Sequence, residues 1–159
     1  MTDPQTSPLS PFDRMPMPPA AKLLGWRLLD HDATVGRVRI GFDGRQDFTN
    51  PAGFVQGGFL AAMLDDTMGP AVFLASGGRL YTATIDLSVH FLGPARPGMF
   101  AAEGRVVRLG RRIAFMEAAL ADATGAEVAR ATASARLVAV EKLPGIQAPL
   151  PTCPGRAQI

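Results

Sequence analysis

The sequence predicts an α+β protein in which one curved antiparallel sheet wraps around one long central helix. Residues 57–75 are apolar on nearly every side, so no polar face can be drawn on them at helical periodicity. The chain that follows alternates as β-strands do and is divided by glycine and proline turns. A buried helix followed by hairpins with one apolar face each is best accommodated by a sheet that curls around the helix.

Length and composition indicate one domain with a substantial hydrophobic core. The chain has 159 residues, 47% of them hydrophobic, and a net charge of +2 that is too small to indicate a nucleic-acid partner. The one cysteine, Cys153, and the two histidines, His31 and His90, predict neither a disulfide framework nor a metal site. We find no stretch that approaches a membrane span, so we expect no membrane partner and a cytoplasmic location.

Proline content divides the chain into three parts. Residues 1–19 hold six of the 14 prolines and predict a Pro-rich disordered lead-in. Four more prolines follow residue 143, so residues 144–159 predict a Pro-rich tail. We therefore expect the folded domain at residues 20–143.

Periodicity and turn residues predict the elements inside this domain. Residues 20–24 predict a short helix that Gly25 ends, and Pro70 predicts that the central helix bends, or ends its regular part, near Asp66. Alternation predicts strands at residues 26–29, 35–42, 80–91, 100–109, 112–121 and 128–140. The last strand carries a row of alanines against which a helix can lie closely. A single sheet around one helix leaves free edges, and edge-to-edge pairing with a second copy predicts a homodimer.

The start of the central helix is a natural site for partial negative charge. The first backbone amides of a helix have no intrahelical acceptor, and Gly57 and Gly58 stand at this position. Because glycine has no Cβ, a ligand can approach these amides closely. Either amide is a candidate donor to a carbonyl that becomes tetrahedral. The alternative is a tight Gly-Gly turn into the helix, without chemistry.

Two adjacent carboxylates, Asp65 and Asp66, fall about two turns into the helix. A carboxylate in an apolar helix is costly unless it is paired, exposed or in use, and no cation lies within one turn of Asp65. We interpret Asp65 as the working carboxylate and Asp66 as an exposed or hydrogen-bonded residue without chemistry. Eight helical steps of about 1.5 Å place Asp65 roughly 12 Å from Gly57, too far for both to serve one carbonyl. Two antiparallel copies of the helix can bring Gly57 of one chain to Asp65 of the other, so this chemistry requires a dimer.

Short motifs in the middle of the chain support a more specific interpretation. They are Asn50, Gly53, Gln56-Gly57-Gly58, Asp65, Thr84-Ile85-Asp86-Leu87 and Phe91-Leu92-Gly93-Pro94-Ala95. Over about residues 20–140 the chain resembles the hotdog-fold acyl-CoA thioesterases of the phenylacetate-degradation type. The resemblance implies hydrolysis of an acyl-CoA or aryl-CoA thioester, with no metal and no cofactor beyond the CoA of the substrate. It also implies a homodimer, for which we expect a dimer of dimers.

The resemblance implies roles for individual residues. The Gly57 amide would polarise the thioester carbonyl, and Asp65 of the other protomer would act as the nucleophile or as the general base on water. Asn50 would help to hold that water or the thioester, Gln56 would hold the loop, and Thr84 would lie near the acid.

Residues around these would bind the rest of the substrate. Gly58 and Phe59 stand at the helix start, where Phe59 would line an acyl pocket or belong to the core. Arg108, Arg111 and Arg112 surround a hairpin turn, and clustered guanidinium groups suit phosphate oxygens such as those of CoA. A solvated turn is the alternative for these arginines.

One departure from the family pattern leaves other activities open. Gln56 stands where many members have His, and a glutamine amide can hydrogen-bond but cannot titrate near neutral pH. Some hotdog thioesterases resemble this chain in having Gln there, so thioester hydrolysis remains compatible. The alternatives are a non-catalytic acyl-CoA-binding protein and a hotdog dehydratase, which would need His90. Alternation from Thr84 predicts His90 on the same strand face, where packing is the simpler role.

Overall fold

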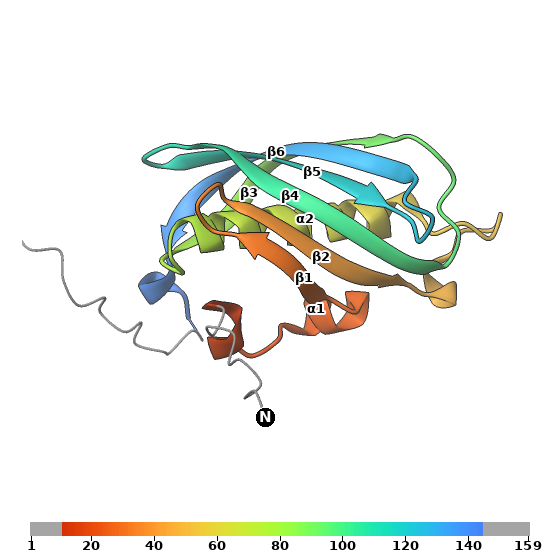
Figure 1. Cartoon of the computed structure of the whole chain (residues 1–159), viewed down its shortest axis with the longest axis horizontal. Helices are drawn as coiled ribbons and strands as arrows, with labels where there is room; N and C mark the ends of the chain where they lie inside the picture. The colour runs from red at the N-terminus through yellow and green to blue at the C-terminus, as the bar shows by residue number, and fades with distance from the viewer. Residues whose placement is uncertain (1–10, 145–159) are drawn as a thin grey trace, which may run out of the picture.

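A computed structural model describes residues 11–144 of the chain, and its single antiparallel sheet has the strand order β1-β2-β4-β5-β6-β3 (Figure 1). The strands are β1 (Arg27–Asp32), β2 (Arg37–Gly44), β3 (Leu80–Phe91), β4 (Gly98–Leu109), β5 (Ile113–Ala121) and β6 (Glu127–Ala139). The helices are α1 (Pro19–Leu24) and α2 (Gly57–Ala75), with 3-10 turns η1 (Pro11–Arg14), η2 (Gln46–Phe48) and η3 (Val140–Lys142). The sheet curls around α2, which confirms the predicted fold class, and β1 and β3 form its two edges.

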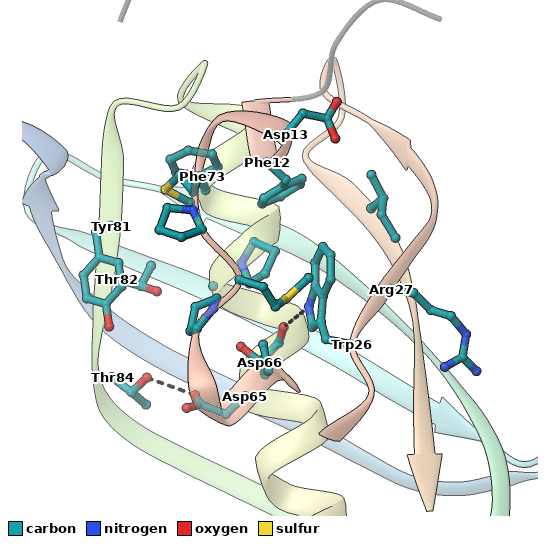
Figure 2. Close-up of a pocket in the computed structure, with 18 of the residues that line it drawn as sticks. Phe12, Asp13, Trp26, Arg27, Asp65, Asp66, Phe73, Tyr81, Thr82 and Thr84 are labelled. Atoms are coloured by element: carbon teal, nitrogen blue, oxygen red, sulfur yellow. Dashed lines mark hydrogen bonds between the residues drawn. The ribbon is translucent and has the colours of Figure 1, made fainter. Parts of the chain in front are cut away.

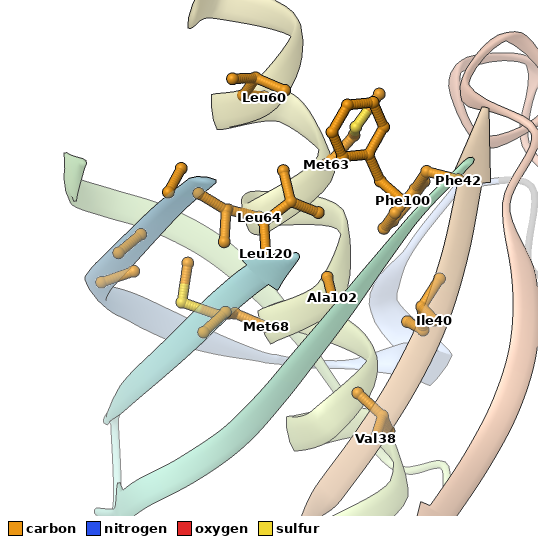
Figure 3. Packing of buried hydrophobic residues seen from close by; sticks show 14 of the residues in the cluster. Val38, Ile40, Phe42, Leu60, Met63, Leu64, Met68, Phe100, Ala102 and Leu120 are labelled. Atoms are coloured by element: carbon orange, nitrogen blue, oxygen red, sulfur yellow. The ribbon is translucent and has the colours of Figure 1, made fainter. Parts of the chain in front are cut away.

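The core lies between α2 and the inner face of the sheet (Figure 3). Leu64 and Met68 of α2 are fully buried, in one cluster with Ile40 of β2. The alanine row predicted on the last strand is buried on this inner face and consists of Ala129, Ala131, Ala133 and Ala135. These small side chains let the sheet approach the helix closely, because they add little thickness between the two layers.

The sheet covers only part of α2, whereas the sequence predicted a helix buried all round. Gly58 and Ala62 are exposed, and Asp65, Asp66 and Gly69 are only partly buried. These residues form a face of small and acidic side chains, which we call the uncovered face of α2. The apolar pattern concealed this face, because glycine and alanine count as apolar whether or not anything packs on them.

Pro70 does not end the helix, which runs on to Ala75. A proline at this position has no N–H to donate to the carbonyl of Asp66, four residues before it. The indole N–H of Trp26 takes its place and donates to that carbonyl at 3.3 Å. The contact ties the residue before β1 to the middle of α2, and this tertiary hydrogen bond replaces the backbone bond that the proline removes.

The beginning of the described chain also differs from the predicted disordered lead-in. Residues 1–10 and the tail from residue 145 lie outside the described residues. Within residues 11–19, however, η1 forms and the Phe12 ring packs 5.6 Å from the Trp26 ring and 5.3 Å from the Phe73 ring, centroid to centroid. One aromatic side chain is enough to anchor a Pro-rich segment to the core, an effect that proline content does not reveal.

α2 reaches the length and apolar composition of a membrane span, contrary to the sequence interpretation that no stretch approaches one. Half of that stretch is buried inside the fold, as in the core helix of a globular protein. Length and hydropathy alone therefore do not distinguish the two environments for this helix.

Candidate active site

A cavity of about 580 Å³ lies against the uncovered face of α2 (Figure 2). α2 forms one wall through Asp65, Asp66, Gly69, Pro70 and Phe73. The beginning of β1, residues 81–84 of β3 and the segment before α1 form the others. The cavity thus occupies the gap between the two edge strands, where the curled sheet does not close.

Asp65 and Thr84 meet at the wall of this cavity (Figure 2). The Thr84 hydroxyl donates a hydrogen bond of 2.9 Å to Oδ1 of Asp65. This contact joins α2 to the edge strand β3 and fixes the orientation of the carboxylate. Because Thr84 occupies only Oδ1, the other oxygen remains available to attack a carbonyl carbon or to accept a proton from water.

Asp66 lies in the same cavity, although the sequence interpretation gave it no chemical role. Its Oδ2 is buried and receives no hydrogen bond from the described residues. Burial, and secondarily the charge of Asp65, raise the pKa of Asp66 to about 6. The adjacent acidic pair in an apolar run was the available signal, but sequence alone does not show which of the two carboxylates is more deeply buried.

The backbone at the start of α2 is open to an acceptor. In the part of the chain that the structure describes, the amides of Gly57 and Gly58 have no hydrogen-bond acceptor, and the side chain of Gln56 does not cap the helix. A Cβ on Gly57 would lie 2.9 Å from Cζ of Phe91, whereas nothing lies within 4 Å of the corresponding position on Gly58. Glycine at position 57 therefore lets the Phe91 ring pack against the helix start.

The other predicted residues of this region have mainly structural contacts. The side-chain oxygen of Asn50 accepts hydrogen bonds from the amides of Ala52 at 3.0 Å and Phe54 at 3.2 Å, which shape the loop before α2. Gln56 is exposed at the end of that loop. Phe59 stacks on Phe48 with ring centroids 4.1 Å apart and does not line the cavity.

The three predicted arginines line a separate hollow of about 540 Å³ at the hairpin between β4 and β5. Arg108, Arg111 and Arg112 share it with Ile113 and Phe115, and it has no residue in common with the cavity beside Asp65. Within residues 11–144, none of the three forms an ion pair. Their guanidinium groups are thus available to an anion, but not beside the carboxylate of the same chain.

His90 does not lie on the strand face predicted for it. Thr84 pairs with Ala135 of β6, on the face toward α2, but a bulge at Ile85 shifts the register by one residue. His90 consequently pairs with Arg130, on the opposite face from the buried alanine row. The alternation looked unbroken because the residues on both sides of the bulge are polar, and the shift removes the geometric basis for a dehydratase that uses His90.

A curved antiparallel sheet around one long helix defines a protein of the hotdog-fold class. The sequence profile of the thioesterase superfamily matches residues 52–129. A protein of Saccharolobus solfataricus that is described as an esterase is 31% identical to this chain over 99 residues, which cover 62% of this chain and 70% of that protein. This chain belongs to the thioesterase superfamily and is a thioester hydrolase by class.

Solved structures agree with this assignment. The crystal structure of a phenylacetic acid degradation-related protein from Ralstonia eutropha JMP134, described as a thioesterase, superimposes with a TM-score of 0.72 and 33% identity, over 77% of this chain and 92% of that one. A protein from Streptococcus mutans UA159, described as bound to acetyl CoA, has a TM-score of 0.64 and 20% identity, over 72% and 89% of the two chains. The first places the chain among the phenylacetate-degradation type, and the second shares its fold.

Proposed function

We propose that this protein hydrolyses acyl-CoA or aryl-CoA thioesters to the free acid and CoA. The observation that carries the proposal is the hydrogen bond from Thr84 to Asp65 at the wall of the cavity. It orients a carboxylate beside a space of about 580 Å³, a size that suits a small organic group. The acetyl CoA bound to the Streptococcus mutans protein of the same fold supports a CoA thioester as the substrate.

Asp65 has two chemical options in this reaction. As a nucleophile, its free oxygen attacks the carbonyl carbon, the C–S bond breaks, CoA leaves as the thiolate, and water then hydrolyses the resulting anhydride. As a general base, it takes a proton from a water that attacks the same carbon and gives the free acid directly. In both cases negative charge develops on the carbonyl oxygen, and we assign the amide of Gly57 as the donor that stabilises it.

Two protomers share each reaction centre in this proposal. Gly57 and Asp65 of one helix lie roughly 12 Å apart along its axis, so they cannot meet at one carbonyl. The free edge of β3, which carries Thr84, offers unpaired backbone groups to a second copy. Pairing of two β3 strands would set the two α2 helices antiparallel, with Gly57 of one facing Asp65 of the other. We expect such dimers to pair further.

The remaining predicted residues bind the substrate in the same scheme. Asn50, in the loop before α2, helps to hold the attacking water or the thioester, and Gln56 holds the loop. Arg108, Arg111 and Arg112 bind phosphate groups of CoA, a role supported by the lack of ion pairs for these arginines within the described residues.

Subunit mixing tests the shared site. Asp65→Asn removes the nucleophile or base, and Gly57→Val blocks the approach to the donor, so each variant alone should release no CoA thiol. After subunit exchange, roughly a quarter of the wild-type activity should return, because half of randomly mixed dimers are hybrids and each hybrid holds one intact site.

The outcomes separate the alternatives. Absence of rescue after verified exchange would contradict the shared site, and near-normal hydrolysis by Asp65→Asn would reassign this carboxylate to structure. A wild-type protein that is stabilised by acyl-CoAs but releases no thiol from any of them would be a non-catalytic binder, the alternative that Gln56 leaves open.

A further inference from the structure

The cavity contains a second carboxylate that the proposed reaction does not use. Asp66 lines the cavity beside Asp65, and its Oδ2 is buried without a donor from the described residues. A buried acceptor with no donor costs free energy, and a charged one costs more. An unsatisfied buried group in a folded protein therefore calls for an explanation, and a functional role in a cavity is one of the common ones.

Two donors that contact this acidic pair are engaged by other acceptors. The indole N–H of Trp26 donates to the backbone carbonyl of Asp66 at 3.3 Å, and the Thr84 hydroxyl donates to Asp65 at 2.9 Å. None of the ion pairs formed within residues 11–144 includes Asp66. The Asp66 carboxylate is therefore an unused acceptor in the wall of the cavity.

We propose that Asp66 recognises a hydrogen-bond donor, a hydroxyl or an amino group, carried by the acyl part of the substrate. The inference rests on the proposed function, because it takes the cavity beside Asp65 as the acyl site. Asp65 and Asp66 are consecutive residues of α2, so a donor bound to Asp66 lies in the same cavity as the reacting carbonyl.

The other walls indicate the rest of the acyl group. Phe12, Trp26 and Phe73 form an aromatic cluster at the cavity, and Met15 lies beside it. Such a lining accommodates a ring or an alkyl chain and offers it few polar contacts. The acyl group that fits is thus apolar along its body, with one donor positioned for Asp66.

The charge state of Asp66 favours donors. Its pKa of about 6 leaves the carboxylate largely ionised at pH 8, where it only accepts hydrogen bonds. An acyl group without a donor leaves this charge desolvated and unpaired when it fills the cavity. A site built to hydrogen-bond its substrate rejects such an analogue strongly.

The test compares matched substrates at pH 8. Hexanoyl-CoA is compared with 6-hydroxyhexanoyl-CoA, and phenylacetyl-CoA with its 4-hydroxy and 4-amino forms, by release of CoA thiol. The wild type should favour the hydroxyl or amino form by roughly tenfold or more in kcat/KM within at least one series. Asp66→Leu, which has a similar size but no acceptor, should abolish this preference and hydrolyse the unsubstituted thioester at least as fast as the wild type.

Two further variants sharpen the result. Asp66→Asn keeps an acceptor oxygen but not the charge, so it should retain part of the preference for the hydroxyl and amino forms, both of which are neutral donors at pH 8. Asp13→Asn changes another carboxylate of the same cavity and should leave the preference unchanged. Melting temperature and dimer content confirm that each variant is folded.

The failure of this inference differs from the failure of the proposed function. If the wild type hydrolyses acyl-CoAs with no preference in either series, the function stands and the role of Asp66 is overturned. Equal losses for all substrates on Asp66→Leu, with weaker dimerisation, would assign the missing donor to the second protomer instead. If no acyl-CoA is hydrolysed at all, the proposed function itself falls.

Discussion

Replacement of Thr84 by valine isolates the contact on which the proposed chemistry depends. The substitution removes the hydroxyl that donates 2.9 Å to Oδ1 of Asp65 and leaves a β-branched side chain of similar shape on β3. Valine is a good strand former, so the free energy of unfolding should change little. What changes is the orientation of the carboxylate, which loses its only hydrogen-bond donor among the described residues.

The structure sets the size of the effect. A hydrogen bond to a charged group contributes about 1.5–3 kcal/mol, and solvent competes with this one because Thr84 is exposed. We therefore take the lower end of that range, which corresponds to about a tenfold loss in rate. The loss should fall mainly on kcat, because Thr84 acts through Asp65 and is a positioning residue.

Thr82→Val is the matched control. Thr82 lies two residues earlier on β3, lines the same cavity and has no side-chain hydrogen bond within the described residues. Steady-state release of CoA thiol from one acyl-CoA should therefore show a lower kcat for Thr84→Val only. Equal kcat values for the wild type and both variants would refute the idea that Thr84 orients the reacting carboxylate.

Three further predictions concern stability. Asp66→Asn should raise the free energy of unfolding by up to about 3 kcal/mol at pH 8 and by little below pH 4. The pKa of Asp66 is raised from 3.8 to about 6, so its protonated form stabilises the folded protein at low pH, and this contribution is lost as pH rises through 6. Urea unfolding at both pH values measures the two gains, and equal gains would contradict the prediction. Gly57→Ala should cost about 1 kcal/mol because its Cβ would meet a ring carbon at 2.9 Å, whereas Gly58→Ala enters open space and should be neutral or slightly stabilising; identical melting shifts would argue against this. Trp26→Phe should cost about 1 kcal/mol less in Pro70→Ala than in the wild type, because the restored backbone N–H takes the same carbonyl while the lost ring packing is common to both; a double-mutant cycle without coupling would show that the indole does not replace the missing backbone donor.

Much of the fold could be predicted because its elements are long and regular. The strand at residues 80–91 and the helix beginning at Gly57 agree with the structure, since alternation and a long apolar run are strong signals. The bulge at Ile85 was not predicted, because Thr84 and Asp86 on either side of it are both polar and the sequence pattern does not show which of them faces the helix. The packing of Phe12 against Trp26 was not predicted either, because it is a single tertiary contact made by a segment dominated by prolines.

The sequence led to the pairing of Thr84 with Asp65 in the candidate site, but not to the burial of Asp66 or the contact made by Trp26. Thr84 and Asp65 were paired through a family resemblance, and the structure brings them to 2.9 Å. Asp66 was misjudged because the burial of a helical carboxylate depends on which strands flank it, and the sequence does not say where a curled sheet stops. The contact between Trp26 and the Asp66 carbonyl was equally hidden, since Pro70 reveals a missing donor but not its replacement.

The open side of the sheet connects these features. A sheet that closed completely around α2 would bury Asp65 and Asp66 beyond the reach of any substrate. Because the sheet stops at β1 and β3, one face of the helix stays accessible. Trp26 fixes the helix to the edge at β1, and Thr84 fixes it to the edge at β3. Two acids held between two edges can then differ in role. Asp65, which is bonded to Thr84, has an oriented oxygen for chemistry, and Asp66, which has no donor among the described residues, has an oxygen open to a bound molecule or a second protomer.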